Sequence, residues 1–511
     1  MRGPHNLLRL ARTGATFERT GAMREVLRRG HAPWPARVAA RGLAFPFRWL
    51  GLRGDPALPP IVRALTALGP AYIKFGQALS TRPDVVGADL AAELMLLQDK
   101  LPPFPTATAR KVIEEELGRP VDEVFSELSE PVAAASIAQV HRARLRDTGE
   151  DVAVKVLRPG VERAFRRDID AFHFVAAALS ALVPSTRRLR PREVVDHFES
   201  VVMRELDLRL EAAAAAEFAA NTAPDEGFAV PAVHWHLSSR RVLTLDWVEG
   251  VPLGDVDALR ASGQDLQALG ERVLALFLRH ALRDGFFHAD MHQGNLKVQH
   301  DGEIHAMDFG IMGRIDEYTR RVYAEILMGF IRKDYRRVAE VHFEAGYVPA
   351  DRDVEAFAQA LRSVGEPIFG MDASKISMGR LLAQLFEVTE QFGMQTRTEL
   401  ILLQRTMVVV EGVARSLNPN INIWEVAQPE VEAYIREHLG PRAAMRDLMA
   451  TLQVLARFGP KLPQLAEAAL VRAGAEDGSA KSGRGGGTLA GFAAGVILAG
   501  GLAAAAFLLA G

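Results

Sequence analysis

The sequence predicts an α+β fold with two lobes, preceded by a helical extension and followed by a hydrophobic terminal segment. Short apolar segments typical of β-strands lie in residues 131–157 and 240–250. From residue 319 to about residue 472, apolar residues recur at helical spacing with few strand signals. Between these parts, Asp290 and Asp308 flank a segment with the pattern of a small β-hairpin. With 511 residues, the chain is long enough for two or three units with cores of their own.

The composition excludes several classes of protein. The net charge of −2 and the pI near 6.7 argue against a nucleic-acid-binding protein, and we expect no nucleic-acid partner. The chain contains no cysteine, so disulfides, thiolate metal sites and cysteine nucleophiles are excluded. This absence fits a reducing cytosol. The apolar stretches near the N-terminus are short and interrupted by arginine, which argues against a secretory signal peptide.

Residues 1–54 are predicted to form a basic, amphipathic N-terminal arm. Arginines are frequent in it, and Glu18 and Glu25 are its acidic residues. Apolar side chains such as Trp49 and Leu50 are interleaved with the arginines. A segment of this kind can lie on an anionic bilayer. A solvated arm is the alternative, and this stretch alone leaves both open.

A helical extension is expected over residues 55–130. Prolines mark its start, and residues 61–118 carry a helical pattern. Lys74 and Gln77 are three positions apart, so on a helix they share one face. On this pattern alone, a polar pair on an amphipathic helix is the simplest interpretation.

The first lobe is expected at residues 131–250, and it begins with β-strands. The strand at 151–157 contains Val-Ala-Val-Lys155, the position at which kinases keep the lysine that pairs with the α- and β-phosphates. In the loop before it, kinases keep glycines, whereas this chain has three alanines and a serine. These residues are Ala133, Ala134, Ala135 and Ser136. A Cβ at each position restricts the backbone and crowds the phosphates, so we expect nucleotide binding to differ from that of a standard kinase.

A long helix is predicted at residues 192–221 of the same lobe. Glu211 on this helix is the candidate partner that fixes Lys155, as a glutamate does in kinases. Glu205 and Asp207 can reach the same cleft, although a charged outer face also accounts for them.

A strand at residues 240–250 then runs into a hinge. We expect the backbone from Asp246 to Val248 to contact an adenine there.

The second lobe is expected at residues 251–440 and carries the candidate catalytic residues. Asn295 lies five positions after Asp290, which matches the D-x-x-x-x-N interval of a kinase catalytic loop, and a DFG sequence follows at Asp308. In phosphoryl transfer, one carboxylate orients the attacking hydroxyl, while an amide and a second carboxylate hold the metal that bridges the nucleotide phosphates. We therefore expect Asp290 to be catalytic, and Asn295 and Asp308 to bind Mg²⁺ with ATP.

The C-terminus is predicted to contain further helices at 441–472, a Gly/Ser linker at 473–487 and one transmembrane helix at 488–511. The last segment has no charged residue across its 24 positions, enough to span a bilayer once. Lys481 and Arg484 precede it, so the positive-inside tendency places the large domain on the cytoplasmic side. A G-x-x-x-G pattern within it indicates helix pairing and hence a homodimer. A buried hydrophobic hairpin is the alternative.

Together these segments resemble the UbiB/AarF family of atypical, protein-kinase-like proteins over residues 65–418. The family's KxGQ motif is matched by Lys74 and Gln77, and its Ala-rich loop by residues 133–136. Its ExD motif is matched by Glu205 and Asp207, with Glu211 at the αC position. Its HxDxHxGN loop is matched by His288, Asp290, His292, Gly294 and Asn295, and its DFG by Asp308.

The resemblance implies a two-lobed protein-kinase-like fold in which the KxGQ helix covers the cleft where a kinase would admit a peptide. Lys74, Gln77, Glu205 and Asp207 would then be site residues. The nucleotide site would also include Val140 and Ala153.

The family is associated with ATP hydrolysis and with small lipid-like or isoprenoid substrates in support of ubiquinone biosynthesis. The implied ligands and partners are ATP, Mg²⁺, a lipid bilayer, lipid-like quinone precursors and quinone-biosynthesis proteins. The implied location is the cytoplasmic face of the inner membrane. Two alternatives stay open, namely a protein Ser/Thr kinase and a nucleotide-gated membrane scaffold with little turnover.

Overall fold

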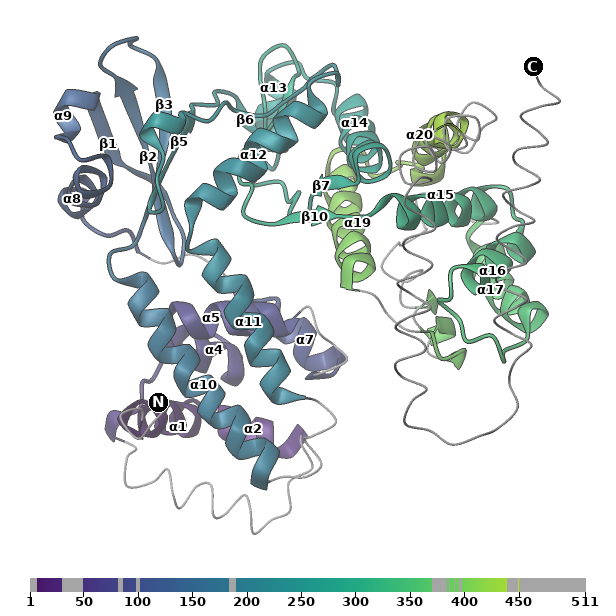
Figure 1. The fold of residues 1–511 in the computed structure, drawn as a ribbon, viewed down its shortest axis with the longest axis horizontal. Helices are drawn as coiled ribbons and strands as arrows, with labels where there is room; N and C mark the ends of the chain where they lie inside the picture. The colour runs from purple at the N-terminus through teal and green to yellow at the C-terminus, as the bar shows by residue number, and fades with distance from the viewer. Residues whose placement is uncertain are drawn as a thin grey trace, which may run out of the picture. The chain divides into compact units, whose positions relative to one another are not determined.

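The computed structural model describes most of the chain up to residue 438. The described residues are 7–29, 49–80, 86–97, 102–182, 190–369, 384–385, 387–389, 391–394, 398–438 and 449. The chain divides into two compact units, residues 1–435 and 436–511, and the first contains the elements that build the site (Figure 1). The predicted segments at 441–472 (apart from residue 449), 473–487 and 488–511 lie outside the described residues. Among the helices that are described, none is both long and apolar enough to cross a bilayer.

The predicted extension at 55–130 begins with three helices, α4 Pro60–Leu68, α5 Pro70–Ser80 and α7 Ala88–Leu94. Residues 7–29, which were expected in a separate N-terminal arm, form α1 Leu7–Thr20 and α2 Ala22–Arg29; both pack on α4 and so belong to the N-terminal extension. The other four helices all contact α4, which begins with a proline at its first turn, where no backbone N–H is needed. Gly76 lets α5 approach this small core closely, because a Cβ there would lie 2.3 Å from Leu97 Cδ1.

The first lobe contains a four-stranded antiparallel sheet in the order β1-β2-β3-β5. Its strands are β1 Phe125–Ala134, β2 Ala138–Leu145, β3 Asp151–Leu157 and β5 Val242–Asp246, and two short helices, α8 Thr106–Leu117 and α9 Val121–Val124, lead into it. The first strand begins at Phe125, somewhat before the predicted start at residue 131. Side chains alternate along β3, so Val154 and Val156 are fully buried beside α8 whereas Lys155 lies on the opposite face.

Three helices follow β3: α10 Val161–Leu182, α11 Pro191–Glu205 and α12 Leu208–Thr222. The single helix predicted at 192–221 is therefore wrong, because the chain breaks between α11 and α12. Asp207 causes this break by acting as the N-cap of α12, where its carboxylate accepts a hydrogen bond from the Arg209 N–H at 3.2 Å.

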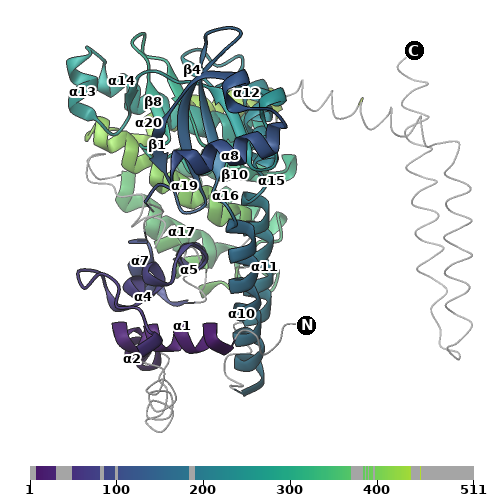
Figure 2. The same ribbon diagram turned by 90° about the vertical axis from the view of Figure 1, so that its left-hand side faces the viewer.

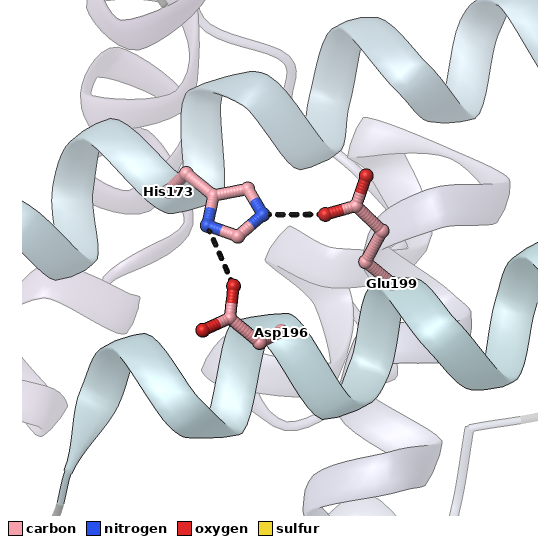
Figure 3. Close-up of side chains that lie close together, drawn as sticks. All are labelled: His173, Asp196 and Glu199. Carbon is pink, nitrogen blue, oxygen red and sulfur yellow. Dashed lines mark hydrogen bonds and ion pairs between the residues drawn. The ribbon is translucent and has the colours of Figure 1, made fainter.

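A buried histidine joins α10 to α11. His173 Nε2 lies 2.7 Å from Glu199 Oε2, and His173 Nδ1 lies 3.6 Å from Asp196 Oδ1 (Figure 3). Both helices also contact α5, and in both views they run beside the extension (Figures 1 and 2). The α10–α11 pair thus connects the extension to the helix that carries Glu211.

The second lobe is mainly helical, as predicted, with short strands near the cleft. Two short elements, β4 Phe228–Ala229 and the 3₁₀-helix η4 Trp235–Leu237, precede this lobe. Its strands are β6 Val251–Pro252, β7 Phe286–His288, β8 Leu296–Val298, β9 Ile304–Ala306 and β10 Met312–Arg314. Its helices are α13 Val256–Ala261, α14 Leu266–Arg279, the π-helix η5 His280–Asp284, α15 Glu317–Ile331, α16 Tyr335–Glu344, α17 Val354–Phe369, α19 Thr398–Leu417 and α20 Ile423–His438. Strands β8 and β9 pair antiparallel, which confirms the predicted hairpin. This hairpin separates Asp290 and Asn295 from Asp308.

Candidate active site

Lys155 lies between two carboxylates that come from different parts of the chain. Its Nζ is 2.7 Å from Glu211 Oε1 on α12 and 3.3 Å from Asp308 Oδ2 in the loop after β9. Lys155 and Asp308 are 153 positions apart in sequence. The predicted pairing of Lys155 with Glu211 is therefore present, and the sheet of the first lobe meets the DFG segment of the second at this point.

The charges of this cluster depend on one another. Burial alone lowers the pKa of Lys155, but the carboxylates of Asp308 and Glu211 outweigh it and hold that pKa above its ordinary value. Although the Asp308 side chain is partly exposed, the protein around it removes water and would raise its pKa, but the Lys155 ammonium and the Gly310 N–H keep that pKa well below its usual range. Burial raises the pKa of Glu211, and Lys155 offsets only part of that rise. Lys155 and Asp308 are therefore both charged at neutral pH.

Asn295 and Asp308 carry side-chain oxygen atoms of the kind that bind magnesium. The Asn295 amide donates from Nδ2 to the Asp290 carbonyl at 3.0 Å, and its Oδ1 accepts no hydrogen bond from any described residue. The Met307 N–H donates to the Asn295 carbonyl at 3.1 Å, which brings Asn295 next to the DFG segment. The Asp308 side chain is 47% exposed, so it is accessible to a ligand. Amide and carboxylate oxygens are hard ligands that suit Mg²⁺.

The candidate catalytic loop, residues 288–295, is held by hydrogen bonds from His288 and from α19. His288 is buried, its Nδ1 accepts the Asp290 N–H at 3.1 Å, and burial lowers the pKa of His288, so the neutral ring is favoured. Thr406 on α19 donates its hydroxyl to the Ala289 carbonyl at 3.1 Å. Thr406 was not singled out by the sequence, because nothing local to it indicates a contact 117 positions away.

Only part of the predicted Ala-rich loop, residues 133–136, is a loop, because Ala133 and Ala134 end β1 and pair with Val140 and Gln139 of β2. Ala135 and Ser136 lie in the turn between the two strands. The guanidinium of Arg158, just after β3, donates to the Ala135 carbonyl at 2.8 Å and to the Pro102 carbonyl at 2.9 Å. The side-chain amide of Gln139 bonds both the N–H and the carbonyl of Phe104, at 2.9 and 3.2 Å. Two connections therefore join this loop to the chain that leaves the helical extension.

The KxGQ residues connect the extension to α11. Lys74 Nζ on α5 lies 3.1 Å from Glu205 Oε2, and both side chains are mostly buried. Gln77 Nε2 donates to the Leu97 carbonyl at 3.2 Å. Asp207 differs from Glu205, because its carboxylate caps α12 and pairs with Arg209 at 2.6 Å. Lys74 and Glu205 are thus brought together, whereas Asp207 shapes the helix that carries Glu211.

The remaining predicted nucleotide residues lie on the sheet and the hinge. Val140 is the cross-strand partner of Lys155, and Ala153 is two positions before Lys155 on the same face of β3. The Asp246 carboxylate is turned toward His234, whose Nε2 is 2.8 Å away, and the Asp246 N–H donates to the Ala232 carbonyl at 3.0 Å. The Val248 carbonyl accepts a hydrogen bond from Lys297 at 2.8 Å, a contact that the sequence did not indicate.

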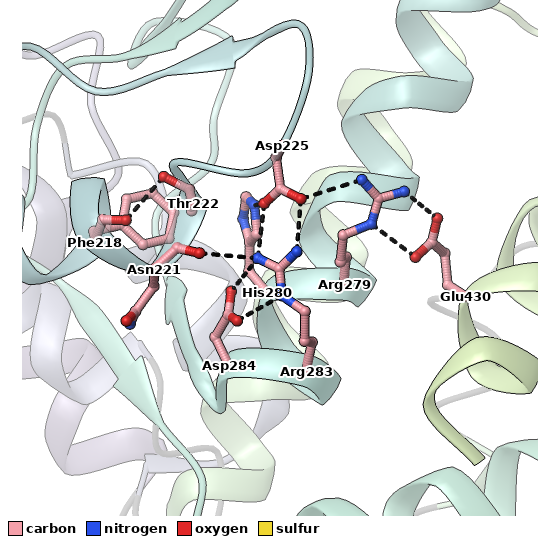
Figure 4. Close-up of polar contacts among 9 residues, drawn as sticks. All are labelled: Phe218, Asn221, Thr222, Asp225, Arg279, His280, Arg283, Asp284 and Glu430. Atoms are coloured by element: carbon pink, nitrogen blue, oxygen red, sulfur yellow. Dashed lines mark hydrogen bonds and ion pairs between the residues drawn. The ribbon is translucent and has the colours of Figure 1, made fainter. Parts of the chain in front are cut away.

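A buried ionic network anchors α12 to the second lobe (Figure 4). Asp225, three positions after α12 ends, is nearly inaccessible, and its carboxylate accepts hydrogen bonds from Arg283 at 2.7 and 2.8 Å and from Arg279 at 3.3 Å. His280 Nε2 lies 3.2 Å from the same carboxylate, and Arg279 also bonds Glu430 of α20 at 2.6 Å. Burial would raise the pKa of Asp225, but these contacts hold it well below its usual range.

The chain is similar to known proteins and to two family models. Residues 96–342 match the ABC1 atypical kinase-like domain, and residues 361–422 match the UbiB helical domain. A protein of Aeromonas salmonicida named "Probable protein kinase UbiB" is 40% identical over 443 residues, which cover 85% of this chain and 80% of the relative. A protein of Pseudomonas paraeruginosa with the same name is 41% identical over 448 residues, which cover 86% and 83%.

A solved structure also resembles the chain. It is the complex of Rv3197 with erythromycin from Mycobacterium tuberculosis, with 27% sequence identity and a TM-score of 0.52. The match covers 69% of this chain and 90% of that protein. Both kinds of similarity support a two-lobed, kinase-like α+β fold.

Proposed function

The chain belongs to the UbiB family of atypical kinase-like proteins, and from this premise we propose that it is a membrane-associated kinase or ATPase that binds Mg–ATP. The activity would support ubiquinone biosynthesis, the process to which the family is linked. The observation that carries the proposal is the position of Lys155 between Glu211 and Asp308, beside the Asp290–Asn295 loop.

Each side chain would have one task in phosphoryl transfer. Lys155, oriented by Glu211, would contact the α- and β-phosphates. Asn295 and Asp308 would hold Mg²⁺, which neutralises developing charge on the phosphates when it is bound. Asp290 would position the nucleophile, either water or a group on a lipid-like molecule. Oriented charges would supply most of the rate, because this reaction needs little covalent chemistry from the protein.

A small, lipid-like acceptor fits the site better than a peptide. The Lys74–Glu205 ion pair fastens α5 to α11, and the Arg158 and Gln139 contacts tie the Ala-rich loop to the same extension. An extension held at several points would hinder the approach of a peptide. The basic arm at 1–54 and the uncharged segment at 488–511 would bring the cleft to the cytoplasmic face of the inner membrane. Quinone-biosynthesis proteins, and a second copy of the chain, are the partners proposed there.

Mg²⁺-dependent ATP hydrolysis by the wild type and by Asp290→Asn, with and without liposomes, tests this proposal. We expect Asp290→Asn to bind ATP normally and to hydrolyse it about a hundredfold more slowly or worse, because the nucleophile loses its positioning carboxylate. Asp257→Asn is the matched control, since Asp257 is 95% exposed on α13. Equal low rates in the wild type and Asp290→Asn would favour the scaffold, and efficient labelling of peptides would favour a protein kinase.

A further inference from the structure

A lysine of the second lobe contacts the predicted hinge. Lys297 is two residues after Asn295, and the side chains of β8 alternate between two faces. Leu296 and Val298 are buried in the core. Lys297 therefore faces the same side as Asn295.

The contacts of Lys297 are all with neutral groups. Its Nζ donates to the Val248 carbonyl at 2.8 Å and lies 5.0 Å from the centre of the Trp247 ring. Within the part of the chain that the structure describes, no carboxylate lies at ion-pair distance from it. No described carboxylate therefore neutralises this half-buried ammonium, and it can donate a hydrogen bond to a ligand.

The position matters because the backbone from Asp246 to Val248 is where the base of a bound nucleotide is expected. Adenine carries an amino donor at C6, whereas guanine carries a carbonyl acceptor there, next to the acceptor N7. An ammonium group can only donate hydrogen bonds. Because Lys297 already donates to the Val248 carbonyl, that carbonyl is less available to the amino group of an adenine, and the ammonium cannot accept a hydrogen bond from it. The O6 of a guanine can instead accept a hydrogen bond from the ammonium, as in the frequent lysine contacts to guanine O6 and N7.

We propose that Lys297 is a specificity-determining residue of the nucleotide site, and that its ammonium makes the site accept guanosine nucleotides as well as adenosine nucleotides. This inference rests on the proposed function, because it assigns the base preference of the same cleft. Inosine triphosphate should behave like GTP, since both carry the oxygen at C6 that Lys297 would contact.

The test is displacement of a fluorescent ATP analogue from the full chain by ATP, GTP and ITP, each with Mg²⁺. For the wild type we expect the three affinities to agree within about fivefold, because the ammonium compensates for the loss of the adenine amino group. For Lys297→Met, which keeps the length of the side chain, we expect the preference for ATP over GTP to rise at least about tenfold. Lys297→Arg should restore the wild-type ratio, and Lys111→Met on the exposed face of α8 should not change it.

The outcomes separate this inference from the function on which it rests. If the wild type binds ATP but binds GTP and ITP about a hundredfold more weakly, the proposal about Lys297 is wrong and the nucleotide site still stands. This comparison needs no variant, so it holds even if Lys297→Met does not fold. An unchanged ratio in a folded Lys297→Met protein would overturn the proposal equally. If the wild type binds no nucleotide, the proposed function itself fails.

Discussion

Single residues at the candidate site are fixed by partners that are distant in sequence. The residue types and spacings of Asp290, Asn295 and Asp308 are local, so the sequence was enough to select them. Lys155 and Glu211 required a further step, because α10 and α11 lie between them and α12 had to reach the sheet before their charges could meet at 2.7 Å. Two supporting residues, Arg158 and Lys297, could not be predicted. Each donates a hydrogen bond to a backbone carbonyl. Because every residue has a backbone carbonyl, the sequence does not indicate which one is the acceptor.

Asp225 allows a prediction at this scale. We expect Asp225→Asn to lower the free energy of unfolding by about 3 to 5 kcal/mol at neutral pH, because Arg279 and Arg283 would lose a buried counter-charge. The pKa of Asp225 in the folded protein is below its ordinary value, so its stabilisation is complete above the unfolded pKa near 4 and is lost as pH falls toward the folded value.

Urea unfolding of the wild type and Asp225→Asn from pH 7 to pH 3 measures this effect. The difference should stay constant down to about pH 5 and shrink below about pH 4. Asp257→Asn, on the exposed face of α13, should unfold like the wild type at neutral pH. A difference that grows as the pH falls would contradict the assignment of an ionised Asp225.

Among the secondary-structure elements, the strands and most of the helices could be predicted, because their apolar periods are strong. The break between α11 and α12 was missed because apolar residues continue at helical spacing on both sides of Asp207. An aspartate is a common N-cap, so a signal was present, but periodicity outweighed it. The break matters for the site, since it turns α12 to present Glu211 while α11 presents Glu205.

The Lys74–Glu205 ion pair provides a prediction at the scale of elements, because it joins α5 to α11. We expect a double-mutant cycle with Lys74→Met and Glu205→Gln to give a coupling of about 1 to 3 kcal/mol in the free energy of unfolding, as both side chains are mostly buried. The control cycle uses Arg336 and Glu340 on the outside of α16, where the coupling should be about 0.5 kcal/mol or less. A Lys74–Glu205 coupling as small as that of the control would mean that the pair does not hold the extension in place.

For the whole molecule, the sequence predicted two lobes with a helical extension, and the fold has this arrangement. Apolar periodicity predicted the helices of the extension but not their position in the fold. The resemblance to the family added the expectation that the KxGQ helix covers the cleft. The Lys74–Glu205 ion pair joins α5 to α11, and the hydrogen bonds at Ala135 and Phe104 lie in and beside the first sheet, whereas the covering of the cleft stays a prediction. The predicted membrane segment at 488–511 lies outside the described residues and stays a prediction.

Removal of residues 488–511 tests the membrane proposal. We expect the full chain to sediment with membranes and to require detergent for release, because an uncharged segment of this length is long enough to span a bilayer. The shortened chain should leave the membrane in high salt, since the basic arm alone would hold it by screened charges. The unchanged melting temperature of the kinase-like unit serves as the control. Detergent-dependent release of both forms would show that 488–511 is not the anchor.

The central claim is that Lys155, Asn295 and Asp308 bind one Mg–ATP together, and the affinity of ATP with and without Mg²⁺ tests it most directly. Calorimetric titration of the wild type should show tighter binding of ATP when Mg²⁺ is added. In Asp308→Asn this gain should disappear, because a carboxylate ligand has been replaced by a neutral amide. If Asp308→Asn binds ATP with Mg²⁺ as tightly as the wild type does, the metal is held elsewhere and the account is wrong.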